Sequence, residues 1–139
     1  AVRVEGTFAY IKARSVPRQS RPYPPLLEVV KDQPTFEFHD EPGVLVGFRF
    51  PAFMQGLNVA GYHFHFINAH RSAGGHVLAC RLKDVSVAVE SADTFHMVLP
   101  HTREFLDADL SPASRRDVER AEQERPGDAQ EPAVLELHQ

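Results

Sequence analysis

Three histidines, His63, His65 and His76, have the residue type and spacing that predict metal chemistry in this chain. His63 and His65 alternate with aromatic residues in the run Gly61-Tyr-His-Phe-His-Phe-Ile67, and such alternation is typical of a β-strand. Side chains on a strand point alternately to its two faces, so both imidazoles lie on the same face. We expect the other face to pack into the core through Tyr62, Phe64 and Phe66.

The run from His76 to Leu82 is expected to be the return strand of a hairpin centred near His70 and Arg71. In that register His65 lies opposite His76, and His63 lies opposite Leu78. Directly opposed residues share a face with Cβ atoms about 5 Å apart, and diagonal neighbours lie about 7–8 Å apart. The three imidazoles are therefore predicted to converge.

Three neutral nitrogen ligands suit Zn2+, and a fourth position left open for water or substrate is typical of catalytic zinc. The alternative interpretation is a solvated strand face, which a single His-x-His pair usually represents. The third histidine, at hairpin register, favours the metal site.

Composition excludes several classes of protein. The chain has 139 residues, 42% of them hydrophobic and 24% charged, as expected for one globular domain. No apolar run approaches the ~18 residues of a membrane span. The formal charge of −4, from 15 basic and 19 acidic residues without a basic stripe, argues against nucleic acid as a partner. Cys80, the single cysteine, is expected to be a buried, unreactive thiol.

The fold class predicted from the pattern is α+β: a mostly antiparallel sheet or partly closed barrel with one C-terminal helix. Short apolar runs separated by Pro and Gly predict strands, and a proline-containing stretch over 15–25 predicts an irregular crossing. The helix is expected to begin at Ser111 and Pro112 and to end at Pro126, followed by a flexible acidic tail over 126–139. The expected strands cover residues 2–10, 26–30, 35–38, 44–48, 61–67, 76–82, 85–89 and 95–99.

Several motifs resemble the alpha-acetolactate decarboxylase family. They are Leu45-Val-Gly-Phe-Arg-Phe-Pro51, Gly56-Leu-Asn-Val59, Gly61-Tyr-His-Phe-His-Phe66 and Gly74-Gly-His-Val-Leu78, with Phe8-Ala-Tyr-Ile-Lys-Ala-Arg14 upstream. The resemblance covers nearly the whole chain, with residues 1–125 as the zinc-binding domain. It corresponds to the second half of the family's chain, and the first half, which contributes an active-site glutamate, has no counterpart. We therefore expect a homodimer or association with the missing N-terminal half.

The resemblance also implies roles for individual residues. His63, His65 and His76 match the zinc ligands, and Arg14 matches the active-site arginine. Glu122 matches the glutamate on the C-terminal helix that reaches the metal centre, and Glu119 and Glu124 lie within a small alignment shift of it. Two positions depart from the family pattern, His70 and Ala79, where aspartate is usual. Changes around a metal's ligands can lower metal affinity or activity about 10–100-fold.

The function implied by the resemblance is zinc-dependent decarboxylation of 2-acetolactate to acetoin in a bacterial cytoplasm. The metal would chelate the hydroxyl and keto oxygens and stabilise the enediolate. Arg14 would bind the carboxylate or the enediolate, and Glu122 would ligate zinc or relay the proton. The partner is a small molecule, with no nucleic acid and no membrane.

Two other functions remain as alternatives. The first is an inactive, truncated module that binds a metal or a small molecule. The second is a cupin-like metalloenzyme, because strand-borne His-x-His pairs also occur there. Iron binding with oxygen uptake would favour the cupin-like enzyme over a zinc enzyme.

Overall fold

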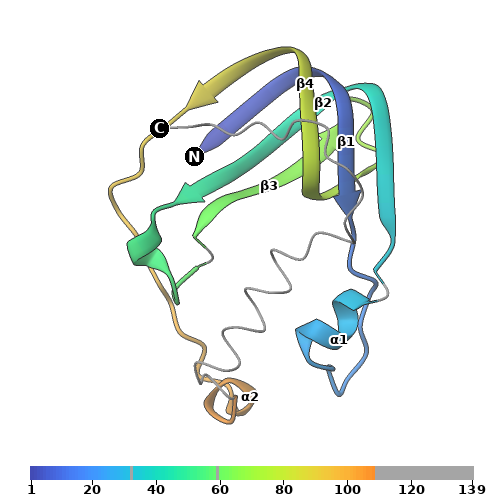
Figure 1. Cartoon of the computed structure of the whole chain (residues 1–139). Helices are drawn as coiled ribbons and strands as arrows, with labels where there is room; N and C mark the ends of the chain where they lie inside the picture. Colours follow the sequence, from blue (N-terminus) through green and yellow to red (C-terminus); the bar gives the residue numbers. More distant parts are fainter. Residues whose placement is uncertain (32, 59, 109–139) are drawn as a thin grey trace.

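The computed structural model describes residues 1–31, 33–58 and 60–108, and its main element is an antiparallel sheet of four strands that close into a ring (Figure 1). β1 pairs with β2 and β4, and β3 pairs with the same two strands. The mostly antiparallel architecture is confirmed, whereas the helix predicted from Ser111 lies outside the described residues. The strands are β1 (Val2–Arg14), β2 (Thr35–Phe50), β3 (Gly61–Asn68) and β4 (Gly74–Val89); the short helices are α1 (Leu26–Lys31), η1 (Ala52–Met54) and α2 (Arg103–Leu106).

The hydrophobic core lies inside the ring, where burial of apolar side chains supplies the main stabilisation. Phe66 of β3 packs edge-to-face on Phe8 of β1, with ring centroids 5.3 Å apart. Phe64 is partly buried against this core, but Tyr62 is 47% exposed. The prediction that all three aromatics of β3 are buried is therefore wrong for Tyr62, which is the second residue of the strand. The buried core cluster consists of Val4, Phe8, Ile11, Ala13, Leu45 and Phe66.

The alternation of β1 shifts by one residue between Phe8 and Ile11. Val4 and Phe8 are buried in the core, and so are Ile11 and Ala13, which have the opposite parity. The register with β4 is irregular at the same place, as expected for a bulge. Because of this shift, Arg14 does not share the face of Phe8 and Val4; it lies on the opposite face of the sheet.

β2 is one continuous strand, although the sequence predicts two runs separated by Pro42 and Gly43. Antiparallel residues direct their N–H and C=O groups to the same neighbour, and the carbonyl of Pro42 accepts a hydrogen bond from Ala69 N–H at 2.8 Å. Ala69 lies just beyond the end of β3. The missing N–H of Pro42 therefore removes no ladder hydrogen bond, and the strand continues through it.

Two predicted strands are wrong. Residues 26–30 belong to helix α1, whose first turn is closed by hydrogen bonds from Glu28 N–H and Val29 N–H to the carbonyl of Pro25, at 3.0 and 3.3 Å. A short apolar run does not distinguish a strand from a helix, and proline before the run favours a helix start. Residues 95–99 have no regular secondary structure, and all of them are exposed.

The start of β1 and the end of β4 lie side by side (Figure 1). Val2 pairs with Val89, and the terminal amino group of Ala1 donates to the carbonyl of Glu90 at 2.6 Å. Within the described part of the chain, none of the helices has the length and hydropathy needed to span a membrane.

Candidate metal centre

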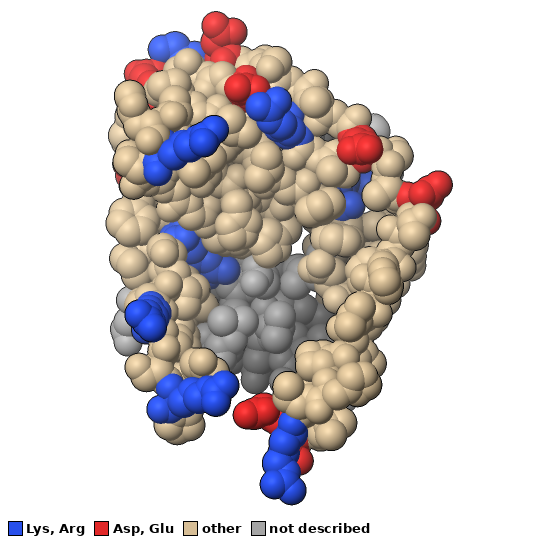
Figure 2. Space-filling model, turned by 180° about the vertical axis from the view of Figure 1, so that it is seen from behind, with Lys and Arg blue, Asp and Glu red and all other residues tan. Residues whose placement is uncertain are grey.

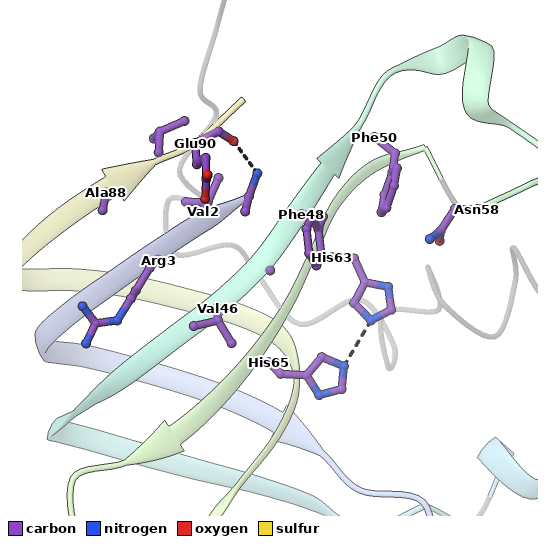
Figure 3. A pocket seen from close by; sticks show the side chains of 13 residues that line it. Val2, Arg3, Val46, Phe48, Phe50, Asn58, His63, His65, Ala88 and Glu90 are labelled. Atoms are coloured by element: carbon purple, nitrogen blue, oxygen red, sulfur yellow. Dashed lines mark hydrogen bonds between the residues drawn. The ribbon is translucent and has the colours of Figure 1, made fainter. Parts of the chain in front are cut away.

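His63 and His65 project from the same face of β3, as alternation requires. Their rings are stacked with centroids 5.2 Å apart and an interplanar angle of 11°. The two Nε2 atoms are 3.1 Å apart, and Figure 3 shows both rings turned to the same side of the strand. We call the face of the sheet that carries His63 and His65 the site face. It is opposite to the face that carries buried Phe66.

His76 completes the cluster from β4. It lies directly opposite His65, as the hairpin pattern predicted. Its ring is nearly perpendicular to the other two, at 88° to His63 and 82° to His65, with centroid distances of 4.7 and 5.4 Å. One ligand nitrogen from each of the three residues lies within 4.8 Å of the others. His76 and His63 are half-buried and His65 is exposed, so the cluster is accessible from one side.

The donor set and its spacing fit Zn2+. Two nitrogens that each lie about 2.0–2.1 Å from a tetrahedral zinc are about 3.3 Å apart, which is close to the 3.1 Å between the Nε2 atoms of His63 and His65. Three imidazoles also leave the fourth position of a tetrahedral site open. Without a metal, the same distance allows the N–H of one imidazole to donate a hydrogen bond to the other ring.

Gly74 and Gly75 allow β4 to approach its neighbours closely beside the histidine cluster. A Cβ atom at Gly75 would lie 2.4 Å from the carbonyl oxygen of Arg14, and one at Gly74 would lie 2.2 Å from that of Phe66. Real Cβ atoms do not approach backbone oxygens so closely. The glycine pair therefore brings the strand that carries His76 against both β1 and β3.

Arg14 is the last residue of β1, and it lies directly opposite His76 of β4. Directly opposed residues share a face, so Arg14 belongs to the site face together with the three histidines. Its side chain is buried, with 4% relative exposure. A buried guanidinium retains its charge, because its pKa lies above the range of other side chains.

An open groove of about 810 Å³ adjoins the histidines. Figure 3 shows His63 and His65 at its edge, with Phe48 and Phe50 of β2 beside them and Asn58 nearby. The sequence analysis did not single out these three neighbours. Phe48 lies directly opposite His63 in the β2–β3 register. Once that pairing is known, alternation along β2 places Phe48 on the site face. His76 and Arg14 do not line this groove.

The remaining candidates have other environments. Glu122, Glu119 and Glu124 lie outside the described residues, as does the expected tail over 126–139. Burial raises the pKa of the Cys80 thiol, which favours the predicted unreactive state, although the residue is only half-buried. His70 is exposed on the hairpin loop.

Basic and acidic side chains are both spread over the surface of the ring. In Figure 2, which views the molecule from behind, basic side chains gather toward the region of α1, and acidic and basic side chains alternate over the strands. Two cross-strand ion pairs illustrate this mixing: Lys83 binds Asp40 at 2.7 Å, and Lys12 lies 3.6 Å from Glu37. The Lys83 ammonium lowers the pKa of the Asp40 carboxyl through a hydrogen bond and charge attraction.

Comparisons with known proteins agree on one family. The family model described as alpha-acetolactate decarboxylase matches residues 1–112. The alpha-acetolactate decarboxylase of Methanosarcina mazei is 47% identical over 122 residues, covering 88% of this chain and 42% of that protein. The enzyme of that name from Bacillus subtilis strain 168 is 40% identical over 123 residues, covering 88% of this chain and 48% of that protein.

Solved structures agree with the sequence matches. The crystal structure of alpha-acetolactate decarboxylase from Bacillus subtilis strain 168 superimposes with a TM-score of 0.82 at 37% identity, covering 88% of this chain and 52% of that chain. The chain thus spans about half the length of the curated relatives it matches. These matches favour the decarboxylase family over the cupin-like alternative.

Proposed function

This chain belongs to the alpha-acetolactate decarboxylase family, and from that premise we propose that it decarboxylates 2-acetolactate to acetoin with zinc held by His63, His65 and His76. The observation that carries the proposal is the convergence of three imidazoles, with ligand nitrogens within 4.8 Å of one another, beside a buried arginine on the same face. When bound there, zinc supplies Lewis-acid chemistry for the hydroxyl and keto oxygens of the substrate.

The reaction requires charge stabilisation and one proton. The bond between the carboxylate carbon and the tertiary carbon breaks, its electron pair moves toward the keto oxygen, and CO2 leaves an enediolate. A proton then adds to the former tertiary carbon and gives acetoin. The protein groups must therefore bind an anion before the bond breaks, stabilise a different anion afterwards, and deliver a proton to carbon.

Arg14 is suited to the first two tasks. Its guanidinium presents a planar set of donors that match a carboxylate, and its burial at 4% exposure strengthens any charge interaction relative to water. β1 fixes its backbone on both sides, through Thr35 of β2 and His76 of β4. We propose that Arg14 orients the substrate carboxylate and then stabilises the enediolate.

Glu122 is the proposed proton donor, on the basis of the family resemblance. A carboxyl group that relays a proton works best with a pKa near the operating pH. The test is a set of three variants, Glu122→Gln, Glu119→Gln and Glu124→Gln, assayed for acetoin formation. Loss of turnover only in Glu122→Gln supports the assignment, whereas loss only in one of the other two variants transfers the role to that residue.

The decisive experiment is acetoin formation from racemic acetolactate by the purified chain, with zinc added and with zinc removed by chelation. We expect zinc-dependent turnover above the spontaneous rate. No turnover by folded, zinc-loaded protein would reject a decarboxylase site within this chain and favour the metal-binding module, which is motivated by its half-length match.

We also propose that further protein covers the part of the site face that borders the groove. This protein is either a second copy of the chain or a separate chain that corresponds to the first half of the family's sequence. Val46 and Phe48 lie on this face and are 45% and 51% exposed. Neighbouring exposed apolar side chains of this kind mark protein interaction sites. Sedimentation velocity of the assayed preparation at micromolar concentration is expected to give a dimer. A monodisperse monomer that is fully active would contradict both forms of this assembly.

A further inference from the structure

The β3–β4 hairpin is closed by one buried polar side chain, Asn68. This last residue of β3 is 7% exposed. Its Oδ1 accepts hydrogen bonds from the backbone N–H groups of Ser72 and Ala73 at 2.9 and 3.2 Å, and its Nδ2 donates to Ser72 Oγ at 3.2 Å. Its backbone N–H donates to the carbonyl of Ala73 at 2.9 Å, and its own carbonyl accepts from Arg71 N–H at 2.9 Å. Asn68 therefore fixes the loop through both its side chain and its backbone.

The rest of the loop contributes little packing. Residues 69–73 are all exposed, so burial of apolar surface does not select their conformation. Arg71 adopts a φ of +55°, a conformation that side chains other than those of Gly, Asn and Asp rarely favour. The carboxamide of Asn68 thus supplies the side-chain hydrogen bonds that hold this loop in shape, together with the backbone hydrogen bonds of Asn68 and of Ala69.

The loop matters because the ladder next to it is short. β3 and β4 pair only at Ile67–Gly74, Phe66–Gly75 and His65–His76. A slip of one residue in a strand pair turns every side chain to the other face, and such a slip would move His76 away from His65. Three pairs, two of which contain glycine, provide few side-chain contacts within this ladder to oppose the slip. On its other side His76 is held by its pairing with Arg14 of β1, so the loop and the β1–β4 ladder together set its position.

We propose that Asn68 is a positioning residue for the metal centre: its carboxamide fixes the loop so that His76 arrives opposite His65. This inference rests on the metal site of the proposed function, but not on the decarboxylation. Removing the carboxamide is expected to weaken metal binding at least 10-fold, as loss of groups that orient ligands does elsewhere.

The experiment compares Asn68→Ala and Asn68→Asp with the wild-type chain by titration with Co2+, whose visible absorption reports both affinity and ligand geometry. Asn68→Ala is expected to bind at least 10-fold more weakly with altered absorption. Asn68→Asp keeps an oxygen that accepts from Ser72 and Ala73 N–H, so it is expected to recover most of the affinity. Equal affinity and an unchanged spectrum in Asn68→Ala would overturn the proposal.

The matched control is Val4→Ala, which removes buried core volume at a position of β1 paired with Leu45 of β2 and Val87 of β4, distant in register from the loop and from His76. All titrations are made well below the unfolding temperature of each variant. Val4→Ala is expected to lower that temperature while leaving the Co2+ affinity of the folded protein within about 3-fold. If Val4→Ala weakens Co2+ as much as Asn68→Ala does, general destabilisation explains the loss, and the proposal fails.

A metal-independent measurement separates this inference from the proposed function. In the metal-free wild-type chain, nuclear Overhauser contacts between His65 and His76 are expected, because the two residues are paired. These contacts should weaken or disappear in Asn68→Ala, and their retention would contradict the role of Asn68. If the wild-type chain binds no metal, the metal site fails, while these contacts still decide whether Asn68 sets the register.

Discussion

The strand pairs of the ring differ sharply in how far they extend. β1 is paired along nearly its whole length with both β2 and β4. β3 and β4 are paired only from Ile67–Gly74 to His65–His76. The histidine cluster lies at the last pair of the short ladder, where the two strands stop pairing and side chains from both can face the same space. A sheet can therefore provide an accessible site without a long loop.

Arg14 and the three histidines, the two parts of the candidate site, come from strands that differ in this way. Arg14 is the last residue of the strand with two long ladders, and it is paired on both sides, with Thr35 of β2 and His76 of β4. The histidines come from the hairpin, where only three pairs and an exposed loop join β3 directly to β4, although each strand also has a ladder with its other neighbour. We infer that the anion binding proposed for Arg14 is preorganised by the sheet, whereas the geometry of the three histidines depends also on local features of the hairpin.

Removing a histidine is expected to have the largest effect, and it tests the role of the β3–β4 hairpin in metal binding. His65→Ala leaves two imidazoles, and we expect stoichiometric zinc to be lost and acetoin formation to fall by more than about 100-fold, the upper range for changes that only disturb ligand orientation. Metal analysis after dialysis and the acetoin assay measure the two effects. His70→Ala, an exposed change in the same hairpin, is the control. Stoichiometric zinc in His65→Ala would refute the site.

Gly75→Ala tests whether close strand approach joins the two parts. Its Cβ would lie 2.4 Å from the carbonyl oxygen of Arg14, so the free energy of unfolding should fall by about 1–3 kcal/mol and zinc affinity should also fall. Denaturant unfolding and zinc titration measure these changes. Gly6→Ala places a Cβ 2.1 Å from Asp84 O, away from the metal centre, and should destabilise without weakening zinc. Similar zinc losses in both variants would contradict the model of a local contact.

Arg71→Gly is expected to have the smallest effect, in the favourable direction. The φ of Arg71 is +55°, which costs an L-residue about 1–2 kcal/mol, and the greater unfolded-state freedom of glycine offsets about 0.5–1 kcal/mol of the gain. Unfolding in urea should therefore show a stabilisation of between zero and about 1.5 kcal/mol. Arg71→Lys, which keeps the same backbone cost, should change nothing. A less stable Arg71→Gly would show that the loop conformation is not a source of strain.

The histidine cluster was predictable because it depends on two local patterns. Alternation placed His63 and His65 on one face, and a hairpin centred between His70 and Arg71 gave the His65–His76 pair that the structure contains. Arg14 was assigned only through family resemblance. Its position beside His76 depends on the one-residue shift in β1, and unbroken alternation from Val4 and Phe8 would have directed Arg14 into the core.

The errors in the predicted fold have related physical causes. Residues 26–30 form a helix because a run of that length carries no decisive period, and the preceding prolines determine its start. Pro42 did not end β2 because its nitrogen, which lacks a hydrogen, faces Ala69, just beyond the end of β3. Both outcomes depend on neighbours in space or on capping, which hydrophobic alternation does not report.

The contact between the amino group of Ala1 and the carbonyl of Glu90 has a consequence for engineering. A polypeptide that enters the ring at residue 1 and leaves it at residue 90 passes through nearly the same point, since neighbouring strands are about 5 Å apart and Val2 pairs with Val89. Segment 1–90 therefore has the geometry of an insertable unit: a surface loop of a host protein could accept it without separating the host's own flanking residues.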